Sequence, residues 1–270
     1  MMSGEDYKSM VQNIRALKKL GQHFLLNEQV AKVEARYASG KRVVEMGPGL
    51  GILTRELCAV AKNVTAVERD PRLYEMLAES LSAGNLKLIS SDFFDLEYGA
   101  LGNPEIMVSN IPYNLSSKTI GWLAEHGMEA VLCLQKEFVE HMLAEPDTRD
   151  YSRLSVITHL QFDVSNVIDV PQSDFYPPPN VDSKVVHIKP NSKLLTHSEL
   201  YIITSIMSHK KKKVRNSIMD AEKALGLSKE DAYRLADSVP SSGERLFKLE
   251  PIKIMEIAKS IDGFKKGSIF

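Results

Sequence analysis

The sequence predicts an α/β fold with a mostly parallel sheet, followed by a small all-α C-terminal region. Three observations lead to this prediction. Short apolar runs alternate with segments long enough for a helix, a glycine-rich turn follows the first run, and the pattern becomes helical beyond Pro190. Strands that alternate with helices form parallel βαβ units, because a parallel connection needs a crossover long enough to hold a helix.

Five runs of β-branched or apolar residues are the expected strands of this sheet. Each is five or six residues long, as buried strands usually are. They cover residues 42–47, 63–68, 86–90, 106–110 and 130–135. A sixth run, residues 185–190, follows the proline-rich stretch FYPPPNVDS and is expected to be a late strand.

Two segments between these runs have the apolar spacing of amphipathic helices, residues 52–62 and residues 71–81. The second is expected to begin at Pro71, because proline suits the first helical position. Asp70 is expected to cap this helix, since its carboxylate can accept the free N–H groups of the first turn.

Beyond Pro190, residues 197–226 and 228–237 have helical spacing and no strand is evident. Residues 191–270 contain 15 Lys+Arg and 10 Asp+Glu, a net charge of +5, whereas the preceding residues contain 19 and 25, a net charge of −6. We therefore predict two domains, residues 1–190 with the sheet and residues 191–270 with basic helices.

The composition excludes a membrane-spanning protein. The chain has 43% hydrophobic and 26% charged residues, and nowhere do 18 apolar residues follow one another. The first residues, MMSGEDYKSM, contain acids where a signal peptide would be basic and then apolar, so a cytoplasmic location is expected. Cys58 and Cys133 lie in apolar patterns without a C-x-x-C partner, and the histidines form no ligand-spaced cluster. We expect buried thiols and no metal.

The stretch EMGPGLGIL joins the first expected strand to a helix, where glycine-rich turns bind nucleotide-like ligands. Gly47, Gly49 and Gly51 form G-x-G-x-G, and Ile52 stands where a dinucleotide fingerprint has its third glycine. S-adenosylmethionine has no phosphate and needs only close backbone approach, so the pattern favours this cofactor. The alternatives are a tight turn without a ligand and an NADP site that uses Arg69.

Two acidic residues at successive strand ends support a cofactor site. Glu68 ends the second expected strand, 21 residues after Gly47, where a carboxylate can accept both ribose hydroxyls. Asp92 comes just after the third strand and is placed to bind the exocyclic amine of the cofactor's adenine. Together with the glycines, these acids predict a methyltransferase that uses S-adenosylmethionine.

The stretch VSNIPYNLSS ends an apolar run in an amide, a proline and an aromatic ring. The exocyclic amine of adenine is a poor nucleophile because its lone pair is delocalised into the ring. If the Asn110 side-chain oxygen and the carbonyl of Ile111 or Pro112 accept its two N–H bonds, the lone pair becomes localised and aimed. Pro112 stiffens the turn, and Tyr113 offers a face on which a base can stack. A strand-ending turn with a packing tyrosine is the alternative.

Six stretches carry a resemblance to the ribosomal RNA adenine dimethyltransferases, the KsgA family. In chain order they are LKKLGQHFLLNE, VVEMGPGLGILT, VERD, SSDFFD, NIPYNLSS and FYPPPNVDS. The resemblance covers residues 17–190 and continues weakly into the helical tail. It implies a Rossmann-like class I methyltransferase domain that dimethylates two adjacent adenines in the 3′-terminal hairpin of small-subunit ribosomal RNA.

The resemblance also implies roles for single residues. His23 and Leu25 look like part of the family's N-terminal cofactor motif, although many members have asparagine in place of His23. Phe175 resembles the second stacking aromatic, which faces the target base opposite Tyr113, with neighbouring prolines stiffening its loop. The family's pattern further places Gly47 against the methionine part of the cofactor, Glu68 on its ribose and Asp92 on its adenine, with Gly49 and Asn110 also among the cofactor-binding residues. Asn110, Pro112 and Tyr113 form the catalytic corner in this pattern.

A run of lysines in the tail, within SHKKKKVRNS, lies in a predicted helix and is expected to form a positive patch around it. Such a patch suits phosphate contact better than base reading, although a solvated face is the alternative. The predicted RNA contacts are Lys210, Lys211, Lys212, Lys213 and Arg215. Arg15, Lys18 and Lys19 are expected to extend this surface.

These observations together predict a two-domain enzyme, a monomer that acts on the small ribosomal subunit and away from membranes. Three alternatives stay open. A DNA adenine methyltransferase and a methyltransferase of large-subunit ribosomal RNA use the same kind of corner. In the third, the protein is mainly an assembly checkpoint or a nucleic-acid-binding factor in which methylation is secondary.

Overall fold

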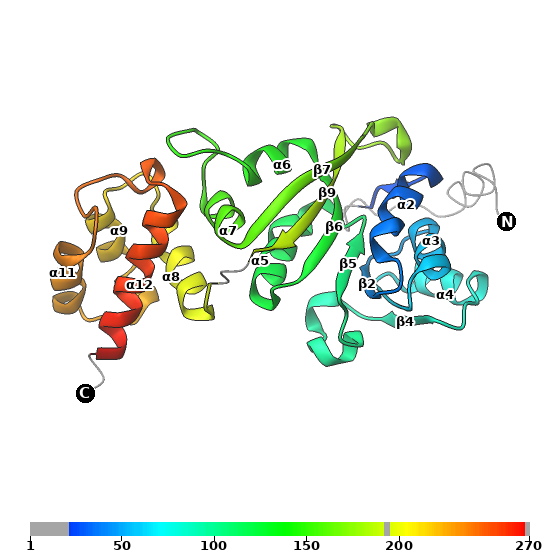
Figure 1. Ribbon diagram of the computed structural model, residues 1–270, viewed down its shortest axis with the longest axis horizontal. Coiled ribbons are helices and arrows are strands. Elements are labelled where there is room, and N and C mark those ends of the chain that lie inside the picture. Colours follow the sequence, from blue (N-terminus) through cyan, green and yellow to red (C-terminus); the bar gives the residue numbers. More distant parts are fainter. Residues whose placement is uncertain (1–21, 192–194, 268–270) are drawn as a thin grey trace. The chain divides into compact units, whose positions relative to one another are not determined.

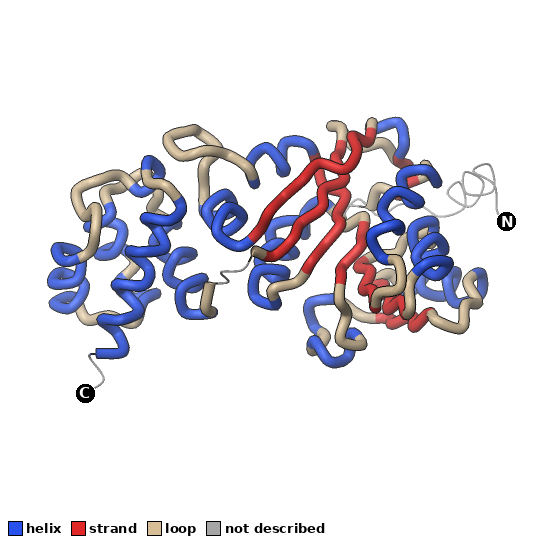
Figure 2. The backbone as a smooth tube through the Cα atoms, in the orientation of Figure 1, coloured by secondary structure: helices blue, strands red, loops and turns tan. Residues whose placement is uncertain are grey.

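The computed structural model describes residues 22–191 and 195–267, and strands of this part form a seven-stranded sheet (Figures 1 and 2). Its strand order is β4-β3-β2-β5-β6-β9-β7. The pairs from β4 to β6 are parallel, and β9 is antiparallel to β6. The strands are β2 (Arg42–Met46), β3 (Asn63–Glu68), β4 (Leu86–Ser90), β5 (Ile106–Ser109), β6 (Glu129–Gln135), β7 (Phe162–Val170) and β9 (Ser183–Pro190).

A second, two-stranded sheet joins segments that are distant in the sequence. Strand β1 (Phe24–Leu25) pairs antiparallel with β8 (Phe175–Tyr176), and Leu25 is the register partner of Phe175. The sequence prediction of six strands is confirmed to within two residues at each end. It missed β1, β7 and β8. The first and last are two residues long, and much of β7 is exposed and polar, as in FDVSNVIDV, so it lacks an apolar run.

Some helices of the sheet-containing part connect parallel strands, as α3 (Ile52–Val60) does between β2 and β3. Helix α4 begins at Pro71, and the Asp70 carboxylate accepts a hydrogen bond from the Arg72 backbone N–H, as predicted for its cap. The helices are α2 (Glu28–Ala35), α3 (Ile52–Val60), α4 (Pro71–Ser80), α5 (Ser116–His126), α6 (Lys136–Met142) and α7 (Arg153–Gln161). Short 3₁₀ turns are η2 (Arg36–Ala38), η3 (Phe93–Asp95), η4 (Tyr98–Leu101), η5 (Tyr113–Leu115) and η6 (Gln172–Asp174).

The described residues beyond Asn191 form helices and no strand, as Figure 2 shows. Their buried faces carry isoleucine, leucine and alanine, which gives this region a core of its own. The helices are α8 (His197–Met207), α9 (Val214–Asp220), α10 (Glu222–Leu225), α11 (Lys229–Ser238) and α12 (Pro251–Gly267), with the 3₁₀ turn η7 (Leu246–Lys248).

The chain divides into two compact units. The described parts of the first unit are residues 22–119, 128–136 and 164–189. The second unit combines the helical region beyond residue 190 with two earlier segments, residues 120–127 and 137–163. The functional division into residues 1–190 and 191–270 stays a proposal.

The glycine-rich turn places helix α3 close to helix α4. Gly51 precedes α3 with a φ of +78°, a left-handed conformation that residues with a Cβ rarely adopt. A Cβ at this position would lie 2.7 Å from Cδ2 of Leu77 and 2.9 Å from Cδ1 of Leu81. Only glycine therefore meets both the backbone and the packing requirement here.

Replacing Gly51 with alanine is expected to lower the free energy of unfolding by about 2 kcal/mol, from the left-handed backbone and the displaced leucines. Urea denaturation measures this change. Gly84→Ala is the matched control, because nothing lies within 4 Å of a Cβ at Gly84. Equal stabilities of the two variants would contradict the argument.

Candidate active site

A pocket in the first compact unit brings together nine of the ten predicted cofactor and catalytic residues. Its empty volume, open mouth included, is about 960 Å³. The nine residues are His23, Gly47, Gly49, Glu68, Asp92, Asn110, Pro112, Tyr113 and Phe175. Leu25 is buried outside this lining, in a smaller cavity that shares several wall residues with the pocket.

The glycine loop forms one wall of the pocket. Gly47 and Gly49 have φ angles of +70° and +58°, and the Gly47 N–H donates to the Val67 carbonyl at 2.9 Å. A Cβ on Gly49 would lie 3.1 Å from Cδ1 of Phe24. Glycine therefore suits the left-handed backbone at both positions, and at Gly49 it also makes room for the Phe24 ring.

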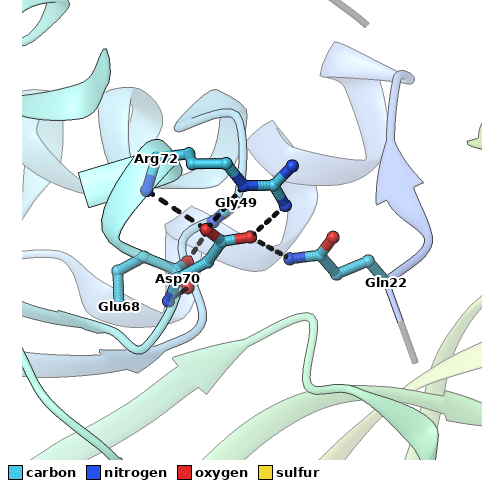
Figure 3. Close-up of polar contacts among 5 residues, drawn as sticks. All are labelled: Gln22, Gly49, Glu68, Asp70 and Arg72. Atoms are coloured by element: carbon cyan, nitrogen blue, oxygen red, sulfur yellow. Dashed lines mark hydrogen bonds and ion pairs between the residues drawn. The ribbon is translucent and has the colours of Figure 1, made fainter. Parts of the chain in front are cut away.

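The carboxylate of Glu68 fastens this loop to the end of β3. Its Oε2 accepts from the Gly49 N–H at 3.2 Å, and its Oε1 accepts from the Asp70 N–H at 2.8 Å (Figure 3). Burial raises the pKa of Glu68, and these backbone hydrogen bonds oppose the increase. Each carboxylate oxygen can accept more than one hydrogen bond, so Glu68 keeps acceptor capacity for ribose hydroxyls.

Asp70 ties the segment before β1 to the start of α4. Gln22 Nε2 donates to its Oδ2 at 3.0 Å, and Arg72 donates to both carboxylate oxygens (Figure 3). The Arg72 guanidinium is the main cause that lowers the pKa of Asp70. Since Gln22 lies directly before His23, this contact holds the predicted cofactor motif at the pocket.

Asp92 follows β4 and has both oxygens engaged. Its Oδ1 accepts from the Phe94 N–H at 3.0 Å, and its Oδ2 pairs with Arg69 Nη1 at 3.0 Å. The Arg69 guanidinium, which the alternative NADP site would use to bind a phosphate, is thus paired with the Asp92 carboxylate. Asp92 retains lone pairs for an amine donor.

Asn110 follows β5 at the centre of the pocket wall. Its Nδ2 donates to Oε2 of Glu34 at 3.2 Å, while its Oδ1 is buried and has no hydrogen-bond partner among the described residues. Ser109, the preceding residue, donates from Oγ to the Met46 carbonyl at 2.6 Å, which fixes the end of β5 against β2. Buried polar atoms usually have a hydrogen-bond partner, so this oxygen is an acceptor that the described residues leave available.

Aromatic rings enclose the same space. The Tyr113 ring stacks on His23, with centroids 5.5 Å apart and planes inclined by 28°, and its hydroxyl shares a 2.8 Å hydrogen bond with Ser183 Oγ. Phe175 is 4% exposed and reaches the pocket from β8. His23 Nδ1 lies 2.7 Å from the Pro177 carbonyl, so Nδ1 carries the proton and donates. These contacts hold the rings in defined positions.

The sequence matches the ribosomal RNA adenine dimethylases over residues 13–239. The chain belongs to this family. The predicted membership and the prediction of a ribosomal RNA adenine dimethyltransferase are confirmed at the level of the family.

Family relatives match along most of their length. The chain is 36% identical over 261 residues to a probable ribosomal RNA small subunit methyltransferase A of Methanopyrus kandleri, covering 92% of this chain and 93% of the relative. A ribosomal RNA small subunit methyltransferase A of Desulforapulum autotrophicum is 36% identical over 227 residues, covering 78% and 80%.

Solved structures confirm the fold class. A dimethyladenosine transferase from Plasmodium falciparum matches with a TM-score of 0.72 at 24% identity, covering 90% of this chain and 98% of that chain. The 23S rRNA methyltransferase ErmE matches with a TM-score of 0.59 at 27% identity, covering 88% and 99%. This family member therefore has a class I methyltransferase fold with a helical C-terminal part.

The structure corrects the predicted helix over the lysine run. Residues 208–213 form turns between α8 and α9 rather than a continuous helix. Three of the five predicted RNA contacts have partners within the second unit. Lys210 donates to the carbonyls of Arg149 and Tyr151, Lys212 pairs with Asp220, and Arg215 pairs with Asp237.

Lys211 and Lys213 are exposed, and within the described ranges their side chains make no hydrogen bond or ion pair. The turn therefore offers these two charges to solvent, while Lys210 serves the packing of its own unit. Arg15, Lys18 and Lys19 lie outside the described residues.

Glu34 is the residue at this site that the sequence interpretation missed. It lies on the face of α2 that also carries Val30, Ala31 and Ala35, and it is 0% exposed. The sequence does contain a signal for Glu34, which lies four residues after Val30 on the apolar face of an amphipathic helix. A charged residue at such a position is expected to be buried with that face.

Three further predictions concerned the cysteines, membrane-spanning segments and metal sites. Both cysteines are free thiols, Cys133 buried and Cys58 partly exposed. Among the described residues, no helix is long and apolar enough to cross a membrane. No three histidine, cysteine or acidic side chains in that part of the chain form a metal-ligand group. The expectation of no metal stays a prediction.

Two fully buried acids make the stability of the fold depend on pH. Burial raises the pKa of Glu45 and of Glu34 to about 8, and a neighbouring acidic charge adds to the increase in each case. The folded state binds these protons more tightly than the unfolded state, so unfolding releases them between about pH 4.5 and 8. Raising the pH through this window therefore lowers the free energy of unfolding.

The Glu45→Gln variant is expected to lose part of this pH dependence, because its amide cannot ionise. For each fully shifted carboxyl the slope is about 1.4 kcal/mol per pH unit. Urea denaturation of both proteins at several values between pH 5 and 8 measures the slopes. Glu79→Gln, at an exposed position of α4, is the control. An unchanged slope in Glu45→Gln would contradict the assignment.

Proposed function

We propose that this protein transfers methyl groups from S-adenosylmethionine to N6 of two adjacent adenosines in the 3′-terminal hairpin loop of small-subunit ribosomal RNA. The product is N6,N6-dimethyladenosine at both positions, made during assembly of the subunit. The observation that carries this proposal is the buried Oδ1 of Asn110, which has no hydrogen-bond partner within residues 22–191 and 195–267. Asn110 lines the same pocket as Tyr113 and Phe175. The names of the curated relatives support the choice of the small subunit.

The chain supplies a fitting cradle for S-adenosylmethionine. We assign its methionine part to the open backbone of Gly47 and Gly49, its ribose to Glu68, and its adenine to Asp92. His23 and Leu25 complete this assignment from the N-terminal segment. When bound, the cofactor supplies an electrophilic methyl group on a sulfonium.

The remaining residues act on the adenine of the RNA. Tyr113 and Phe175 hold the base between them, and an RNA loop gives up an unpaired base at low cost. Asn110 Oδ1 accepts one N–H of its amine, and the carbonyl of Ile111 or Pro112 accepts the other. The Pro112 carbonyl already accepts from the Leu115 N–H at 2.9 Å, which leaves it one lone pair. Both acceptors are uncharged and fixed, so they localise the lone pair on nitrogen without removing its proton.

A second candidate is methylation of large-subunit ribosomal RNA. It is favoured by the structural match to ErmE, whose name gives 23S rRNA as its substrate. Incubation with methyl-labelled S-adenosylmethionine and unmodified ribosomal subunits separates the two. Label in N6,N6-dimethyladenosine of the small-subunit hairpin supports our proposal, and label in large-subunit RNA contradicts it.

Replacing Asn110 with alanine is expected to lower the rate of methyl transfer by about 10²- to 10³-fold or more, because the transition state loses a fixed acceptor. Binding to unmodified small subunits should persist, since the phosphate contacts proposed for the lysine run do not involve Asn110. Single-turnover transfer and a sedimentation binding assay measure the two quantities. Loss of both would argue that Asn110 supports the fold or docking, and thermal melting tests the first of these.

Lys211 and Lys213 are proposed to contact RNA phosphates, so their replacement by alanine should weaken rRNA binding. The slope of log affinity against log salt should fall by about two, because each substitution removes one cation from a phosphate. Stability should be unchanged. Lys210→Ala is the contrasting variant, because removing its bonds to two carbonyls should lower the unfolding free energy by about 1 kcal/mol. An unaltered salt slope in the double variant would remove these lysines from the interface.

We also keep as proposals a monomeric state, a cytoplasmic location and the small ribosomal subunit as partner. The alternative of an assembly checkpoint is compatible with the same site, because a docked enzyme that transfers slowly would do both.

A further inference from the structure

Glu34 is a buried acid without a cationic partner among the described residues. Its side chain is 0% exposed on α2, and its Oε2 accepts from Asn110 Nδ2 at 3.2 Å. Its Oε1 has no hydrogen-bond partner in the part of the chain that the structure describes. A buried carboxyl with so few bonds destabilises a fold, and an apolar side chain would suit the stripe formed by Val30, Ala31 and Ala35 better. Its one hydrogen bond leads directly to the pocket.

That hydrogen bond decides which end of the Asn110 amide remains available as an acceptor. With Nδ2 turned toward Glu34, Oδ1 is the end that makes no hydrogen bond to the described residues, and Asn110 is one of the residues that line the pocket. The opposite orientation would present N–H groups there. Two donors, the amide and the amine of a target adenine, would then face each other and repel.

We propose that Glu34 is a positioning residue, which holds the Asn110 amide with its oxygen toward the amine of the target base. This inference rests on the proposed function, because the amine is that of the adenine to be methylated. Glu34 acts only through Asn110 and touches neither the base nor the cofactor. By accepting from Nδ2 it also polarises the amide, which makes Oδ1 a stronger acceptor.

The charge state of Glu34 changes how strictly it selects the orientation. An ionised carboxylate only accepts, so Nδ2 must face it. A protonated carboxyl can also donate to Oδ1, and the amide is then free to adopt either orientation. Glu45 and Cys133 are the titratable groups whose charges couple to Glu34. Burial first, and then the charge of Glu45, raise the pKa of Glu34 to about 8. The productive orientation is therefore enforced most strictly above that pH.

Glu34→Gln is the informative substitution, because glutamine has the same shape and can both donate and accept at every pH. At every pH the Glu34→Gln variant should therefore behave as the wild type does with Glu34 protonated, when the Asn110 amide can adopt either orientation. We expect kcat for transfer to unmodified small subunits to be equal in the two proteins at pH 6.5. At pH 9.5 the wild type should be about fivefold faster, the factor expected from one net hydrogen bond. The ratio of the two rates cancels every pH effect that both proteins share.

Two further variants complete the comparison. Glu34→Leu removes the acceptor altogether and should lower kcat on the order of tenfold at every pH, with the KM for the subunit unchanged. Glu28→Gln, near the start of the same helix, is the control and should behave as wild type. A kcat ratio of wild type to Glu34→Gln that stays at one from pH 6.5 to 9.5 would overturn the proposal.

A measurement independent of activity separates this proposal from the proposed function. In the full-length protein, the NMR signals of the Asn110 side-chain amide should shift with pH around 8, and this shift should vanish in Glu34→Gln. If wild type transfers no methyl group to any subunit, the proposed function fails, while this titration still tests the contact. If the Asn110 signals ignore pH in wild type as well, the positioning role fails even where methyl transfer is normal.

Discussion

Parallel strand pairing is the constraint on which the whole site depends. Because β2, β3, β4 and β5 run in one direction, their carboxyl ends meet at the same edge of the sheet. The glycine loop, Glu68, Asp92 and Asn110 each follow one of these ends. Reversing a single strand would move one of the four groups to the opposite edge, so the chemistry depends on topology before it depends on any side chain.

Most of the sheet was predictable because its central strands are buried on both faces and therefore read as continuous apolar runs. The expected residues of β3 and β4 agree with the structure at both ends. Strand β7 could not be found in this way, since its exposed polar residues break the run. The lysine run was expected to continue a helix, but Lys210 turns inward to carbonyls that are about sixty positions away in the chain. Such long-range partners leave no periodic signal.

In the candidate site, too, residues in local motifs could be predicted from the sequence, whereas a residue that depends on a long-range contact could not. Motif spacing identified Gly47, Glu68, Asp92 and Asn110 because each belongs to a local strand–turn unit. Spacing gave no indication of Glu34, whose proposed role depends on a contact with Asn110, 76 positions further along the chain.

Glu34, Glu45 and Glu68 are all buried with raised pKa values. These three poorly solvated acids favour unfolding at high pH. Raised pKa values of this kind are typical of functional sites.

The pairing of β1 with β8 has a mechanical consequence for the pocket. Leu25 and Phe175 are register partners, and His23 bonds to the carbonyl of Pro177 just beyond the pair. The wall that begins at His23 and the wall that presents Phe175 are thus two edges of one small sheet. Because the strand pairing joins the two walls, it sets the distance between them, and a ligand that contacts both must fit that distance.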